Sequence, residues 1–100
     1  MTMRTGARRG ASIVASLLRV IGLAIVTVIV VHILLVLLDA NPENTFAKLV
    51  REIAEYFSLG LTNLFLPADP KLAIALNFGV AALIWFLITA VVVRLVRRVG

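Results

Sequence analysis

The sequence predicts an all-α membrane protein, a hairpin of two transmembrane helices with an amphipathic helix in the extracytoplasmic loop. Three observations indicate this fold. Of the 100 residues, 62% are hydrophobic, and two long runs carry no charge. The segments before the first run and after the second carry only basic charges, and all acidic residues lie between the runs. Soluble globular domains contain about 45–50% apolar residues, so a mean hydropathy of +1.11 is too high for one. The length leaves room for one structural unit rather than two domains.

The first element is a run of 19 uncharged residues between Arg19 and Asp39, VIGLAIVTVIVVHILLVLL. As a helix it would be about 28 Å long, which matches a hydrocarbon core of about 30 Å. The apolar pattern extends back to Ala11, so we expect a helix over residues 11–38, preceded by a basic tail over residues 1–10.

A cleaved signal peptide is the main alternative for this first run. Its apolar core would be about 7–15 residues long and would end at a small-residue cleavage site. The run here is longer and leads into LLVLLDANPEN, which has no A-x-A pattern. These differences favour a span that is retained in the protein.

The second span is a run of 22 uncharged residues between Lys71 and Arg94, LAIALNFGVAALIWFLITAVVV. As a helix it would be about 33 Å long, again enough to cross a bilayer. We therefore predict a transmembrane helix over residues 72–93, followed by a second basic tail over residues 94–100.

Most arginines lie in the segment before the first span and in the segment after the second span. The flanks contain no acidic residue, whereas the loop of residues 39–71 contains three basic and five acidic residues. An excess of Lys and Arg marks the cytoplasmic side, so we predict that both termini are cytoplasmic in a multi-pass protein of the bacterial plasma membrane. We expect seven arginines to contact lipid headgroups: Arg4, Arg8, Arg9, Arg19, Arg94, Arg97 and Arg98.

The loop contains the pattern of an amphipathic helix over about residues 42–59. Asn41 is suited to cap its amides, and Pro42 fits the first helical position. Apolar residues then recur at spacings of three and four, opposite a charged side. We expect this face to dock on protein or on lipid through Phe46, Leu49, Val50, Ile53 and Phe57.

The order of span, short helix, loop and span is also that of a potassium-channel pore. That family needs a run such as T-V-G-Y-G, whose carbonyl oxygens replace the water shell of the ion. The nearest match here is the SLGL of residues 58–61, with a single glycine and no aromatic residue after it. A pore of that type is therefore excluded.

Few residues could carry chemistry. The chain has no Cys, neither span contains Asp, Glu, Lys or Arg, and the only histidine is His32, inside the first span. We therefore expect no enzyme activity, no cofactor and no metal site. The arginine tails could contact nucleic acid, but lipid headgroups explain them more simply, and we expect no nucleic-acid partner.

Two sets of residues are candidates for helix association. His32 and Asn77 lie at similar depths in an antiparallel hairpin, so we expect them to meet through an interhelical hydrogen bond. Ala75, Gly79 and Ala82 form a stripe of small side chains that suits close approach of another helix. We expect this stripe to bind another integral membrane protein or a second copy of the chain.

Residues 39–87 read DANPENTFAKLVREIAEYFSLGLTNLFLPADPKLAIALNFGVAALIWFL. The Asn-Pro after the first span and the pieces FSLGL, LPADPK and LNFG resemble a family of small two-span membrane proteins of actinobacteria. Tails that use Arg and never Lys also suit a high-GC genome. The resemblance implies a fold and a membrane location, and no reaction.

Two classes of function are compatible with these patterns. The first is a non-enzymatic accessory or scaffolding subunit that acts through helix–helix association. The alternative is a small homo-oligomeric pore, since holins and mechanosensitive channels share this topology. A pore needs a polar stripe along one helix, and two of the four residues in the best stripe are apolar: Asn77, Ala81, Trp85 and Thr89. We therefore prefer the accessory role.

Overall fold

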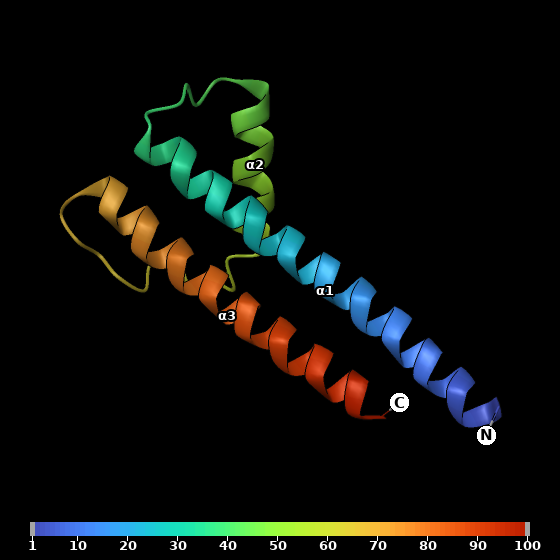
Figure 1. Ribbon diagram of the computed structural model, residues 1–100. Coiled ribbons are helices and arrows are strands. Elements are labelled where there is room, and N and C mark those ends of the chain that lie inside the picture. Colours follow the sequence, from blue (N-terminus) through green and yellow to red (C-terminus); the bar gives the residue numbers. More distant parts are fainter. Residues whose placement is uncertain (1, 100) are drawn as a thin grey trace.

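The computed structural model describes the backbone of residues 2–99 and the side chains of residues 9–99. Within this part of the chain there are three helices and no strands: α1 (Thr2–Leu37), α2 (Thr45–Tyr56) and α3 (Pro70–Val99) (Figure 1). The prediction of an all-helical fold with two long apolar helices is confirmed. The molecule is elongated, with extents of 60 × 27 × 18 Å.

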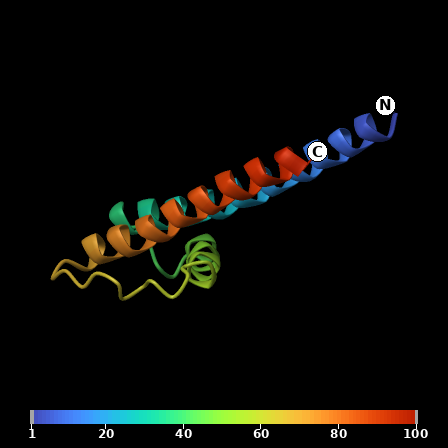
Figure 2. The same cartoon turned by 90° about the horizontal axis from the view of Figure 1, so that it is seen from below.

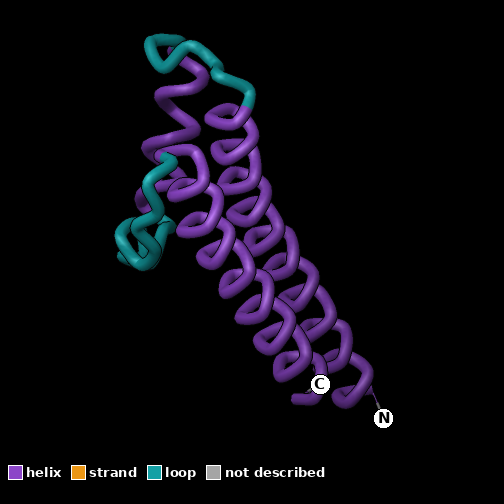
Figure 3. Tube along the Cα trace, turned by 90° about the vertical axis from the view of Figure 1, so that its left-hand side faces the viewer, coloured by secondary structure: helices purple, strands orange, loops and turns teal. Residues whose placement is uncertain are grey.

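The two long helices form an antiparallel hairpin. α1 and α3 lie side by side along most of α3, with both termini at the same end (Figures 1 and 3). The two helices are in close contact at Gly22, where an added Cβ would overlap the side chain of Thr89. Glycine at this position lets the two backbones come together, because any larger residue would push α3 away.

The opposite end of the hairpin is closed by two helix caps and an ion pair. α1 ends where Asp39 adopts a left-handed conformation (φ 57°), with Ala40 N bonded to Leu35 O at 2.8 Å. α3 begins at Pro70, and the side chain of Asp69 accepts from Lys71 N at 3.0 Å. Lys71 Nζ also lies 2.8 Å from a carboxylate oxygen of Asp39, which joins the two helix ends.

Both long helices extend further than the sequence patterns predict. α1 begins at Thr2 rather than at residue 11, and α3 continues to Val99 rather than ending at residue 93. The uncharged runs therefore mark the apolar parts of the helices and not their ends. Arginine is a good helix former and neither basic flank contains proline, so nothing in these tails stops the helix.

The short helix is also displaced from its predicted bounds. Asn44, and not Asn41, caps α2, accepting from Phe46 N at 2.9 Å and Ala47 N at 3.3 Å. Asn41 instead accepts from Glu43 N at 3.0 Å and forms a local turn, which ends before the helix starts. Two Asn residues three apart offer competing caps, and the pattern alone does not choose between them.

α2 lies on one face of the hairpin and does not extend beyond its end. It packs mainly against α1, and the chain after it runs back beside α3 to the start of that helix (Figures 1 and 2). We call α2 and the following segment, residues 45–69, the inserted loop. Figure 3 shows its non-helical part folded against the side of the helices.

Candidate functional site

The inserted loop reaches from the closed end of the hairpin to its middle. α2 has 12 residues and is therefore about 18 Å long. Its Ala54 is fully buried and shares a core cluster with Ile29 of α1 and with Phe78 and Ala81 of α3. Because both long helices contribute to this cluster, the last turns of α2 seal the groove between them.

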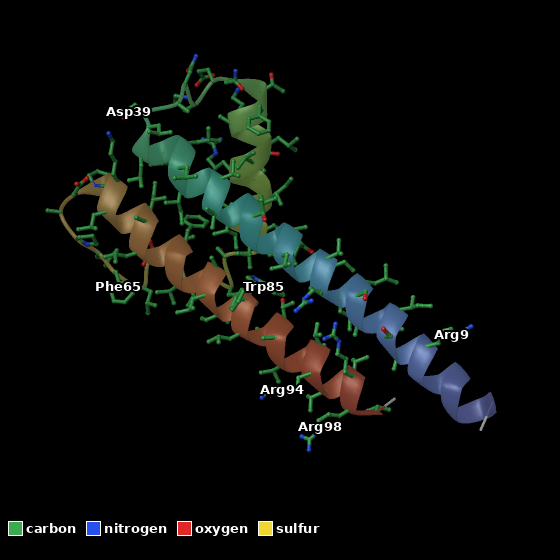
Figure 4. The ribbon with its side chains drawn as sticks, in the orientation of Figure 1. Arg9, Asp39, Phe65, Trp85, Arg94 and Arg98 are labelled. Atoms are coloured by element: carbon green, nitrogen blue, oxygen red, sulfur yellow. The ribbon has the colours of Figure 1, made fainter. Side chains whose placement is uncertain are left out.

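Trp85 holds the end of α2 at the middle of the hairpin. Its Nε1 donates a hydrogen bond of 2.8 Å to the carbonyl oxygen of Phe57, and the two rings meet edge to face with centroids 5.7 Å apart. Trp85 lies 14 residues beyond Lys71, about 21 Å along the helix, in the middle part of α3 (Figure 4). The bond also satisfies a carbonyl at a helix C-terminus, where intrahelical partners are missing.

A tight turn reverses the direction of the chain directly after α2. Ser58 is buried, and its hydroxyl donates to Glu55 O at 2.7 Å. Leu59 and Gly60 follow with left-handed φ values of 59° and 72°. A left-handed conformation is costly for leucine and ordinary for glycine, so Gly60 is suited to this reversal, although α2 itself already ends at Tyr56 rather than at the predicted residue 59.

Asn77 binds the returning segment of the inserted loop to α3. Its side-chain oxygen accepts from Phe65 N at 2.7 Å, and its nitrogen donates to Phe65 O at 3.0 Å and to Thr62 O at 2.8 Å. Asn77 is 3% exposed, so water does not compete for these bonds. Figure 4 shows Phe65 on the loop beside the first half of α3.

The predicted hydrogen bond between His32 and Asn77 is wrong. The amide of Asn77 is committed to the loop backbone, and His32 packs edge-on against Phe78, with ring centroids 4.7 Å apart. His32 also borders a small cavity of about 60 Å³ whose wall includes Arg51. The sequence pattern could not show this arrangement, because it placed the loop outside the hairpin.

The predicted docking face of α2 is correct in part. Val50 is buried, Ile53 and Phe57 are half-buried, and the fully buried Ala54 belongs to the same face although the pattern missed it. Small residues carry little weight in an apolar pattern, which is why Ala54 escaped notice. The remaining members do not dock within the chain, since their side chains are 59% and 53% exposed: Phe46 and Leu49.

α2 has an exposed charged face, which at Arg51 borders the small cavity beside His32. Arg51, Glu52 and Glu55 are exposed, and within residues 9–99 none of them forms an ion pair. Lys48 pairs with Glu43 at 3.3 Å, near the start of the helix. Glu55 lies two residues before Phe57, whose carbonyl oxygen accepts the hydrogen bond from Trp85.

The stripe of small residues on α3 divides into a buried part and a free part. Ala82 belongs to the core of the hairpin, whereas Ala75 and Gly79 are half-exposed. A Cβ at Gly79 would meet nothing within 4 Å, so the hairpin itself does not need glycine there. The close contact that the sequence analysis missed is at Gly22, the only glycine of the first apolar run.

The four residues considered as a pore lining all contact the rest of the chain. Asn77 and Trp85 bind the inserted loop, Ala81 is fully buried, and Thr89 packs on Gly22 while its hydroxyl donates to Trp85 O at 2.7 Å. This face of α3 is therefore a docking face for α1 and the loop. It cannot line a lumen.

The arginines at the open end of the hairpin border a second cavity. It has a volume of about 470 Å³, and its walls include Arg19, Arg94, Arg97 and Arg98. Arg9 lies further along α1 and is not part of it. The predicted headgroup residues Arg4 and Arg8 lie outside the residues whose side chains are described.

Among the described side chains, no group of three or more His, Cys, Asp or Glu residues is placed to hold a metal ion. Comparison of the chain with protein-family models, with curated proteins and with solved structures finds no match.

Proposed function

We propose that the chain is an integral membrane protein in which α1 and α3 cross the bilayer, and that it serves as a non-enzymatic accessory or scaffolding subunit. Both helices are long and apolar enough to cross a membrane, and only 17% of an apolar 18-residue stretch of each is buried within the chain. Water is a poor environment for so much exposed apolar surface, whereas a bilayer covers it. The resemblance to small two-span membrane proteins supports the same location.

The charges at the two ends of the hairpin define how it would sit. Lys71 and Asp39 fall at the outer surface, and Arg19 and Arg94 fall at the cytoplasmic surface. Trp85 then lies about 21 Å from Lys71 and about 14 Å from Arg94 along α3. In this orientation the inserted loop is re-entrant, entering from outside and turning near the middle of the bilayer.

The hydrogen bonds of the loop suit that environment. Lipid offers no partner to a peptide group, and each unsatisfied group costs several kcal/mol. Asn77 and Trp85, two helical turns apart on α3, together satisfy four backbone groups of residues 57–65. These two polar side chains in an apolar helix thus support a loop that is held at membrane depth.

The charged face of α2 is the observation that carries the functional proposal. Arg51, Glu52 and Glu55 are exposed on a helix whose end is fixed at the level of Trp85. Ionised side chains at this depth are costly when they face lipid and are found facing protein or water. The protein therefore needs a partner that covers this face, which makes assembly its role.

The charge pattern favours a different protein as that partner. Two copies of the chain inserted in the same orientation and related by a two-fold axis at this face would bring α2 to α2 in parallel, so that Glu55 would face Glu55. Juxtaposed like charges in a dry interface cost several kcal/mol. A second membrane protein with complementary charges avoids this cost, so we prefer an accessory role to self-association.

A homo-oligomeric pore is the second candidate. A water-filled lumen would tolerate like charges, and the carboxylates of Glu52 and Glu55 form no ion pair within residues 9–99. Rings of carboxylates line many cation pathways. Such a lumen would be bounded by α2, because the polar stripe of α3 is occupied by the loop.

Affinity purification from native membranes tests the accessory role. A membrane protein should co-elute with the wild type and be reduced about tenfold by Glu55→Lys, which reverses a charge on the covered face. Glu43→Lys makes the same change on the exposed turn before α2 and should retain the partner. Co-elution that is equal for both variants, or the absence of a stoichiometric partner, would contradict the proposal. Ion conductance by the purified chain in planar bilayers would establish the pore instead.

A further inference from the structure

The cavity at the open end of the hairpin combines a charged rim with an apolar wall. Arg19 enters from α1, and three further arginines enter from the last turns of α3. Figure 4 shows Arg94 and Arg98 at this end of the molecule. Towards the middle of the hairpin the wall continues with the side chains of Leu23 and Phe86.

The register of the two helices explains why these arginines gather at one place. The contact between Gly22 and Thr89 sets α1 against α3. One helical turn from that contact, in opposite chain directions, are Arg19 on α1 and residues 92–94 on α3. Arg94, Arg97 and Arg98 are separated by three and four residues and so lie on one side of α3.

Within residues 9–99 no acidic side chain pairs with the arginines of this cavity. All five acidic residues belong to the segment 39–69, at the other end of the hairpin or along the inserted loop. The ion pairs formed within residues 9–99 are Glu43–Lys48 and Asp39–Lys71, and neither involves an arginine of the cavity. Four exposed guanidinium groups around one cavity therefore favour the binding of an anion there.

We propose that this cavity binds the phosphodiester headgroup of an anionic phospholipid such as phosphatidylglycerol. Guanidinium groups bind phosphate oxygens through paired, charge-assisted hydrogen bonds. The apolar wall of Leu23 and Phe86 extends from the arginines towards the bilayer interior, where an acyl chain would continue from the headgroup. A free phosphate compound would use the rim and leave this wall uncovered, so the lipid fits the whole cavity.

This inference rests on the membrane orientation proposed above, and it does not depend on the partner or on a pore. Lipid binding is measured on the purified chain alone, whereas the accessory role is measured by co-elution from membranes. A failure of one proposal is therefore distinguishable from a failure of the other.

Native mass spectrometry of the purified protein provides the test. Titration with phosphatidylglycerol and with phosphatidylcholine should show about tenfold tighter binding of the anionic lipid. Arg19→Gln/Arg97→Gln removes one arginine from each wall and should abolish that preference. Lys48→Gln/Arg51→Gln removes the same net charge outside the cavity and should keep it. Glutamine retains a high helix propensity, and circular dichroism of both variants checks that they are folded.

Three outcomes would overturn the proposal. The first is equal binding of the two lipids by the wild type. The second is an equal loss of preference in the cavity variant and in the control variant, which would reflect net charge alone. The third is displacement of the lipid by glycerol phosphate at a similar concentration, which would mean that the cavity selects a soluble phosphate compound and not a lipid.

Discussion

The indole nitrogen of Trp85 lies 2.8 Å from the carbonyl oxygen of Phe57 and donates a hydrogen bond to it. This bond joins the middle of α3 to Phe57, the C-cap residue that follows α2. A hydrogen bond is strongest where water is excluded, and a partner left unpaired there is costly. The position of this tryptophan, far from both ends of its helix, is thus explained by an anchoring role.

Trp85→Phe should release the end of α2 from the hairpin. The substitution keeps an aromatic ring but leaves the carbonyl of Phe57 without its donor, at a cost of about 1–3 kcal/mol. The chain has no cysteine, so Ser58→Cys introduces a unique probe at a buried position of the turn. We expect the probe to react slowly with a soluble maleimide in the parent chain and at least about fivefold faster with Trp85→Phe present.

Phe86→Leu is the matched control, because Phe86 is adjacent in sequence and 51% exposed. It should leave the reactivity of the probe unchanged. Equal labelling rates in the parent chain and in Trp85→Phe would mean that the hydrogen bond does not hold the loop in place.

Asn77→Leu should loosen the returning part of the inserted loop. One amide makes three hydrogen bonds to the backbone at Thr62 and Phe65, and each contributes about 1 kcal/mol. The amide of Phe65 should therefore exchange its hydrogen at least about tenfold faster in the variant. Hydrogen exchange with peptide-level mass spectrometry measures this change.

Asn63→Leu provides a comparison for the Asn77 experiment. Asn63 is exposed, and the described part of the chain shows no side-chain hydrogen bond for it. Loss of protection in Asn63→Leu but not in Asn77→Leu would contradict the role assigned to Asn77.

The contrast between α3 and α2 shows which features the sequence predicts. Long uncharged runs determine a pair of apolar helices, and two consecutive spans of one membrane run in opposite directions. These features depend on composition and spacing, so the hairpin follows from them directly. Helix ends depend on single capping groups, and here Asn41 and Asn44 compete, so the start of α2 was misplaced by three residues.

The position of the inserted loop could not be predicted in the same way. The apolar face of α2 could be covered equally well by protein, by lipid or by the outer ends of the helices, so its pattern does not distinguish between these places. Its actual place depends on Asn77 and Trp85, whose polar groups match the loop backbone only after the chain has turned at Gly60. A polar side chain inside an apolar helix was the available signal, and it was assigned to the wrong partner.

The proposed topology places residue 5 in the cytoplasm and residue 48 outside. Seven arginines in the flanks and a loop with three basic and five acidic residues favour this orientation. Thr5→Cys and Lys48→Cys, each as the only cysteine, can be treated with a membrane-impermeant thiol reagent in intact cells. We expect labelling at position 48 in intact cells and at position 5 only after the cells are lysed. The reverse pattern would invert the hairpin and with it the assignment of the arginine cavity to the cytoplasmic side.

Two glycine substitutions separate the internal packing of the hairpin from its external contacts. Gly22→Leu places a side chain where Thr89 already lies, and overpacking of this kind costs about 1–3 kcal/mol. Gly79→Leu enters open space, because a Cβ there meets nothing within 4 Å, and should change stability by less than about 0.5 kcal/mol. Unfolding of the purified variants in mixed detergent, followed by circular dichroism, measures both values.

The same pair of variants then tests the association face. Gly79 is half-exposed beside Ala75, and leucine at this position would fill the groove that a second helix needs for close approach. If this groove binds the partner, Gly79→Leu should reduce co-elution from native membranes while its unfolding curve matches that of the wild type. Gly22→Leu should instead lower stability and affect co-elution through the fold. An unchanged partner yield in Gly79→Leu would remove the small-residue stripe as an interface and leave the charged face of α2 as the site of assembly.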